Sequence, residues 1–103
     1  MNGKIKNEHI DALFRAVLEL RDSEECYMFF EDICTVSELN AIAQRLEVAR
    51  MLRDKKTYSE ISEETGASAA TISRVNRCLN YGADGYKLIL ERMTEENGDE
   101  KID

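Results

Sequence analysis

The segment from residue 57 to 80 limits the fold of this chain more than any other part. Its sequence, TYSEISEETGASAATISRVNRCLN, places Gly66 between two stretches of helical character. Glycine readily adopts the left-handed conformation that ends a helix. Two short helices that cross near such a turn also need a small residue at the crossing and apolar residues that hold the second helix down. The residues of these kinds are Ser62, Ile61, Ile72 and Val75. The segment therefore predicts a helix-turn-helix over about 57–80.

Capping residues indicate where both of these helices begin. Thr57 is followed three residues later by Glu60, which is the pattern of a capping box. Ser68 and Thr71 have the same spacing at the start of the second helix. We therefore expect the first helix to begin after Thr57 and the second after Ser68.

The composition favours an all-α fold with short connections. The chain has 103 residues with no proline and only five glycines, so one small helical domain over about residues 1–93 is expected. No apolar run reaches the roughly 18 residues that would span a membrane. The N-terminal residues lack the apolar core of a signal peptide. These features predict a cytoplasmic protein without a membrane partner.

Apolar residues recur at helical spacing in the remaining parts of the chain. We expect further helices over about 8–20, 23–33, 35–52 and 84–93. Asp22 or Ser23 would cap the second of these, Thr35 or Ser37 the third, and Asp84 the last. The acidic segment 94–103 is predicted to be a disordered tail.

The helix expected after Asp22 is apolar nearly all round, through Tyr27, Met28, Phe29 and Phe30. A helix of this kind must be buried on more than one side. A second copy of the chain is the simplest source of the second covering surface. The segment of about 8–34 is therefore predicted to form dimerisation helices.

The net charge of −7 is unfavourable for binding DNA, because affinity rests on neutralising phosphates. The acidic groups, however, are concentrated at the two ends. Residues 1–34 carry four basic and eight acidic groups, and residues 91–103 carry two basic and six acidic groups. Residues 45–80 carry seven basic and five acidic groups. Local DNA binding is therefore compatible with the overall charge.

The exposed face of the second helix is predicted to read DNA, because small residues let a helix enter a major groove about 12 Å wide. Ala69 or Ala70 could contact a thymine methyl group, while Ser68 and Ser73 could bond a base edge or a phosphate. Arg77 is the best candidate for a phosphate or guanine contact. The alternative interpretation is that Arg77 is a solvated surface arginine without a DNA contact. The predicted DNA-binding residues are Ser68, Ala69, Ala70, Thr71, Ser73, Arg74 and Arg77.

The segment GASAATISRVNRCL resembles the recognition half of the bacterial tryptophan repressor superfamily. The residues that carry the likeness are Gly66, Ala67, Ala70, Thr71, Ile72, Ser73 and Arg74. Upstream, TVSELNAIAQRLEVARML resembles the preceding helix of that family, with Thr35, Glu38, Ala41, Arg45 and Leu52 in matching places. The resemblance covers roughly residues 30–93 and is strongest to the YerC/YecD-like branch. It implies a TrpR-like intertwined helical homodimer that regulates transcription.

The resemblance also indicates where an effector would bind. In the tryptophan-responsive members two arginines sandwich the indole ring, and Arg45 and Arg74 stand at those places. Thr35 matches a threonine near the ligand. Val75 replaces a glycine that leaves room for the ring, and Cys78 replaces a serine near the ligand carboxylate. Since closely packed interiors have little spare volume, the methyl groups of Val75 predict that tryptophan is not the effector.

Other classes of function find little support. Cys26, Cys34 and Cys78 show no CxxC pairing and indicate reduced thiols, and His9 adds no nearby ligand, so no metal site is expected. No catalytic residue pairing or cofactor-binding loop is evident.

We therefore predict a DNA-binding homodimeric regulator, a repressor, acting on a palindromic operator. One alternative is a repressor that depends on tryptophan, another small effector or a partner protein. The other is a helical module that binds only protein.

Overall fold

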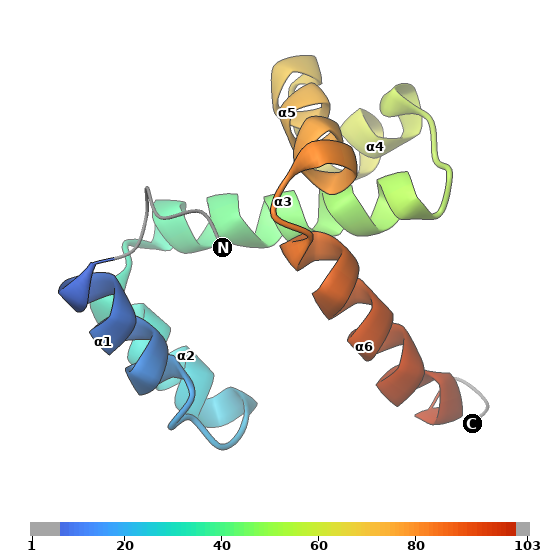
Figure 1. Ribbon diagram of the computed structural model, residues 1–103. Helices are drawn as coiled ribbons and strands as arrows, with labels where there is room; N and C mark the ends of the chain where they lie inside the picture. Colours follow the sequence, from blue (N-terminus) through green and yellow to red (C-terminus); the bar gives the residue numbers. More distant parts are fainter. Residues whose placement is uncertain (1–6, 101–103) are drawn as a thin grey trace. The chain divides into compact units, whose positions relative to one another are not determined.

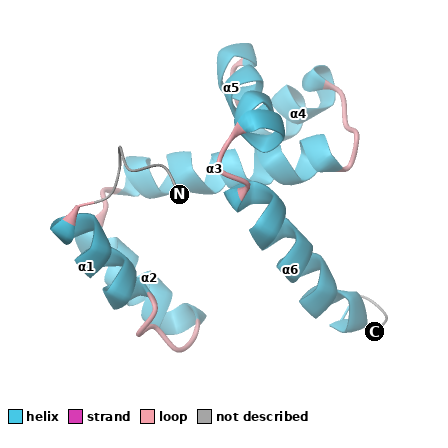
Figure 2. Ribbon diagram, in the orientation of Figure 1, coloured by secondary structure: helices cyan, strands magenta, loops and turns pink. Residues whose placement is uncertain are grey.

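The computed structural model describes the backbone of residues 7–100 and the side chains of residues 7–95. These residues form six α-helices and no strand, which confirms the all-α fold class (Figure 2). Among them, no helix is long and apolar enough to cross a membrane. Contacts divide the chain into two units, residues 1–41 and 42–103, and each unit is described by itself.

The first unit contains α1 (Glu8–Val17), α2 (Ser23–Ile33) and the start of α3 (Val36–Arg53). Side-chain oxygens cap all three helices. The Asn7 side chain accepts a hydrogen bond from the Ile10 N–H, and the Asp22 carboxylate accepts one from the Glu25 N–H. The cap residue of α2 is therefore Asp22, one of the two that the sequence offered.

Thr35 is the cap of α3, as one of the two sequence alternatives predicted. Its hydroxyl accepts a hydrogen bond from the Glu38 N–H at 3.0 Å, and its own N–H donates to the Glu38 carboxylate at 2.8 Å. This reciprocal pair is a capping box.

Helix α1 ends at Val17 rather than near Leu20. After Val17 the hydrogen bonds change to the 3-10 pattern: the N–H groups of Glu19 and Leu20 donate to the carbonyls three residues back. Such bonds commonly close the last turn of a helix.

The second unit contains the rest of α3, together with α4 (Tyr58–Thr65), α5 (Ala69–Tyr81) and α6 (Gly85–Glu100). Helix α5 packs against α4 and α6 (Figure 1). Residues from all four helices, and from the turn before α5, form its hydrophobic core: Val48, Ala49, Met51, Ile61, Ala67, Ile72, Val75 and Leu90. The core thus fixes α5 on a scaffold of three other helices.

Helix α6 is longer than the sequence predicted. Segment 94–103 was expected to be disordered, whereas the helix continues to Glu100, and residues 101–103 lie outside the described residues. A guanidinium nitrogen of Arg53, at the end of α3, donates to the Leu90 carbonyl at 3.1 Å and to the Thr94 hydroxyl at 2.8 Å. These bonds stabilise α6 at the position where the acidic sequence suggested that it would end.

Candidate nucleic-acid interface

Helices α4 and α5 have the local structure that residues 57–80 predicted. The Thr57 hydroxyl accepts from the Glu60 N–H at 3.1 Å, and the Thr57 N–H donates to the Glu60 carboxylate at 2.8 Å. Gly66 ends α4 in the left-handed conformation, with φ of 75°, and its N–H donates to the Ser62 carbonyl. The predicted capping box and glycine turn are both confirmed.

Thr65 stabilises this turn in a way that the sequence did not reveal. Its hydroxyl donates to the Ile61 carbonyl at 2.7 Å and accepts from the Ala67 N–H at 3.1 Å. Its carbonyl accepts from the Gln44 side chain at 3.1 Å, which links the turn to α3. Gln44 is 21 residues away in the sequence, so no local pattern could have indicated the contact.

The apolar residues that were predicted to hold α5 in place are buried. Ile61, Ile72 and Val75 are at most 1% exposed. Ala67, just before α5, is also buried. Ser62, the small residue expected at the crossing, is exposed. The orientation of α5 therefore depends on packing around Ile61, Ile72 and Val75.

Most of the predicted DNA-reading residues lie on the exposed side of α5. All of them are exposed except Thr71, which is half-buried: Ser68, Ala69, Ala70, Thr71, Ser73, Arg74 and Arg77. Ser68 caps the helix, because its hydroxyl accepts from the Thr71 N–H at 3.1 Å. No acidic residue lies in the first turn of α5. This face is small, polar and basic, which suits an approach to a polyanion.

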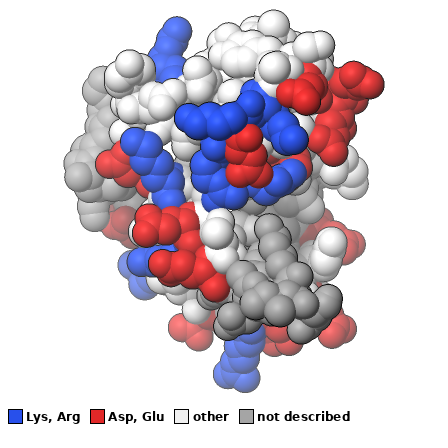
Figure 3. All heavy atoms as spheres, turned by 90° about the vertical axis from the view of Figure 1, so that its right-hand side faces the viewer, with Lys and Arg blue, Asp and Glu red and all other residues white. Residues whose placement is uncertain are grey.

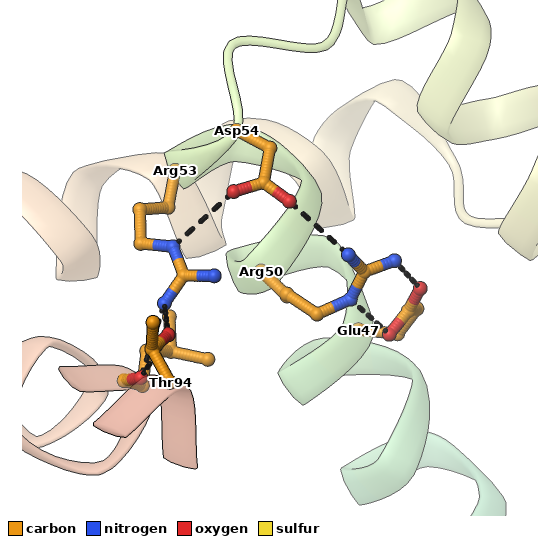
Figure 4. Close-up of polar contacts among 6 residues, drawn as sticks. Glu47, Arg50, Arg53, Asp54 and Thr94 are labelled. Carbon is orange, nitrogen blue, oxygen red and sulfur yellow. Dashed lines mark hydrogen bonds and ion pairs between the residues drawn. The ribbon is translucent and has the colours of Figure 1, made fainter. Parts of the chain in front are cut away.

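The C-terminal end of α3 carries a network of charged side chains (Figure 4). The Arg50 guanidinium binds both Glu47 and Asp54, and Arg53 binds Asp54 at 3.3 Å. The hydrogen bond from Arg50 lowers the pKa of Glu47, and the same bond raises the pKa of Arg50. These two arginines are therefore largely neutralised within the chain.

A cavity of about 570 Å³ lies beside α3, α5 and α6. Arg45 and Cys78, from the predicted effector pocket, line it together with apolar residues such as Leu46 and Ile89. Val75 belongs instead to the hydrophobic core, and Arg74 is exposed outside the cavity lining. Of the effector residues predicted in this unit, only two are brought together at the cavity.

Thr35, the remaining predicted effector residue, belongs to the first unit and caps α3. The five predicted effector residues do not form one pocket within a single unit.

The model of the Trp repressor protein family matches residues 8–94. The chain belongs to the Trp repressor family. Its relative YerC from Bacillus subtilis (strain 168), an uncharacterised protein, is 58% identical over 92 residues, which make up 89% of this chain and 88% of YerC. The resemblance to the YerC-like branch of the Trp repressor superfamily is thereby confirmed.

Solved structures support the same Trp repressor fold. A TrpR-like protein from Eubacterium eligens ATCC 27750 is 55% identical, with a TM-score of 0.86 over 89% of this chain and 95% of that chain. A candidate Trp repressor from Staphylococcus aureus is 51% identical, with a TM-score of 0.84 over 87% and 90% of the two chains. Membership of the Trp repressor family supports a DNA-binding regulator at the level of the family.

Proposed function

We propose that this chain is a sequence-specific transcriptional repressor that binds a palindromic operator as a homodimer in the bacterial cytoplasm. The observation that carries this proposal is the exposed, small and basic face of α5, held in place by the buried Ile61, Ile72 and Val75. In a helix-turn-helix the second helix lies in the major groove with its N-terminal residues on the base edges. Ala69 and Ala70 then contact bases, and Arg74 and Arg77 contact phosphates or guanines.

The first unit supports the homodimer. Helices α1 and α2 contain no buried residue, although both are rich in apolar side chains. Leu18 is 82% exposed, and Tyr27 and Met28 are 66% and 64% exposed. Exposed apolar surface on this scale is characteristic of an interaction site. A second copy of the chain, intertwined through these helices, would bury it and would supply the second α5 that a palindrome requires.

Val75 argues against tryptophan as the effector. Its side chain is buried in the core, so the volume that a glycine would leave open is filled. A small molecule of another class, or a partner protein, is the alternative regulator. Calorimetry with tryptophan tests this point, and saturable binding would contradict it.

The DNA-binding role is tested by titrating a random-sequence duplex with the protein at several salt concentrations. We expect binding at low salt, and we expect Arg77→Ala to reduce the slope of log affinity against log salt by about 1.8, because each subunit of the dimer loses one phosphate contact worth about 0.9. Arg92→Ala, an exposed arginine on α6, is the matched control and should leave the slope unchanged. A wild-type protein that binds no DNA at low salt would favour a protein-only interaction module.

A further inference from the structure

Two lysines, Lys55 and Lys56, lie at the turn between α3 and α4. Lys55 and Lys56 are exposed, and neither forms an ion pair with any residue that the structure describes. Arg50 and Arg53, just before them, are engaged by carboxylates. Figure 3, which views the side of the chain that carries this turn in Figure 1, shows basic groups gathered around acidic ones. Within residues 50–56, the two arginines therefore form ion pairs and the two lysines do not.

The backbone of this turn places Lys55 where glycine is normally found. The Lys55 N–H donates to the Leu52 carbonyl and the Lys56 N–H donates to the Met51 carbonyl, each at 3.0 Å. This pair of bonds defines a Schellman motif, whose first residue beyond the helix cap is left-handed and is usually glycine. Lys55 has a φ of 66° there. A side chain with a β-carbon is strained in this conformation.

Lys55 therefore makes the turn less stable than glycine would, and its ammonium group forms no ion pair within the described chain. Within the described residues, no ion pair of the Lys55 ammonium group offsets the free energy that the turn loses. A contact of the side chain with something outside the chain would supply one.

The position of the two lysines indicates what that contact is. They directly precede Thr57, the cap of α4, and α4 is the first helix of the proposed helix-turn-helix. In such motifs the first helix crosses the phosphate backbone while the second lies in the groove. We propose that Lys55 and Lys56 bind phosphates of the DNA backbone beside the groove that α5 enters. This inference rests on the proposed DNA-binding function and extends the interface to the α3–α4 turn.

Lys55→Gly tests the inference, because stability and binding should change in opposite directions. Relief of the left-handed strain should raise the thermal midpoint by several degrees, on the order of 4 °C. On a random-sequence duplex each substitution removes one phosphate contact per subunit of the dimer, so the slope of log affinity against log salt should fall by about 1.8, and by about 3.6 in Lys55→Gly/Lys56→Ala. Lys87→Ala removes the same charge from a lysine that faces Asp84 at 4.0 Å, and it should leave the slope unchanged.

The outcomes separate this inference from the proposed function. If wild-type protein binds and Arg77→Ala lowers the slope while both lysine variants leave it unchanged, only the role of the lysines is overturned. A lower thermal midpoint in Lys55→Gly would also overturn it, because the lysine would then stabilise the fold. If the wild-type protein binds no DNA, the inference and the proposed function fail together.

Discussion

Arg74 and Val75 are neighbours on α5 but lie in opposite environments. Arg74 is exposed on the face proposed to read DNA, whereas Val75 is 1% exposed within the core. The core around Val75 includes Ile61 from α4 and Leu90 from α6. Two adjacent residues of α5 therefore have different roles: Arg74 belongs to the proposed DNA-binding face, and Val75 to the packing that orients the helix.

At the residue scale, Val75→Ala should destabilise the fold by removing two buried methyl groups and leaving a small cavity. We expect the free energy of unfolding, measured by urea denaturation, to fall by about 2 kcal/mol. Ser73→Ala changes an exposed residue two positions earlier and should alter it by less than about 0.5 kcal/mol. An equal effect of the two substitutions would contradict the assigned role of Val75.

At the element scale, helix starts depend on reciprocal caps that are stronger when the carboxylate is charged. The Thr57 N–H lowers the pKa of Glu60, and the Thr35 N–H lowers the pKa of Glu38 in the same way. Both caps lie at the N-terminal ends of their helices, where a negative charge is favoured. Protonation of either glutamate therefore weakens the start of its helix.

The direction of the resulting pH dependence follows from the lowered pKa values. Each carboxylate contributes its full stabilisation above its unfolded-state pKa and loses it as pH falls through the lower folded-state pKa. We expect Glu38→Gln/Glu60→Gln to lose less thermal stability on acidification than the wild-type protein does. Glu63→Gln alters an exposed glutamate of α4 outside the cap and should keep the wild-type acid dependence. Parallel acid profiles for all three proteins would refute the role of the caps.

The sequence predicted elements whose signals are local. The Thr57–Glu60 cap, the left-handed Gly66 and the buried Ile72 all follow from residues within a few positions of one another. The extension of α6 did not follow, because Arg53 and Thr94 are 41 residues apart. The left-handed Lys55 was also missed, because that conformation normally belongs to glycine.

The predicted functional residues were also recovered only in part, because local sequence signals do not show which distant residues come together. The exposed face of α5 could be predicted because helical periodicity alone fixes which residues share it. The effector residues were drawn from places distant in the sequence, and only Arg45 and Cys78 line the cavity. Tertiary packing decides such groupings, and no local pattern encodes it.

At the scale of the whole molecule, an acidic net charge coexists with basic side chains that are available to bind phosphate. The chain carries a net charge of −7, while the cations that form no ion pair with the described residues include Arg74, Arg77, Lys55 and Lys56. An acidic remainder discourages non-specific association with nucleic acid. We therefore expect binding to be confined to the surface formed by α5 and the α3–α4 turn.

The same surface must occur twice in a homodimer built through α1 and α2. A two-fold axis relates the two copies in such a dimer, so the DNA site must be two-fold symmetric as well. Two recognition helices on one face of DNA meet successive major grooves, with half-sites about 34–36 Å apart.

Selection of bound duplexes from a random DNA pool by the full chain tests the central claim most directly. The account predicts enrichment of a near-palindrome whose half-site centres are separated by about one helical turn. Enrichment of no sequence, or of an asymmetric single site, would contradict a homodimeric operator-binding repressor.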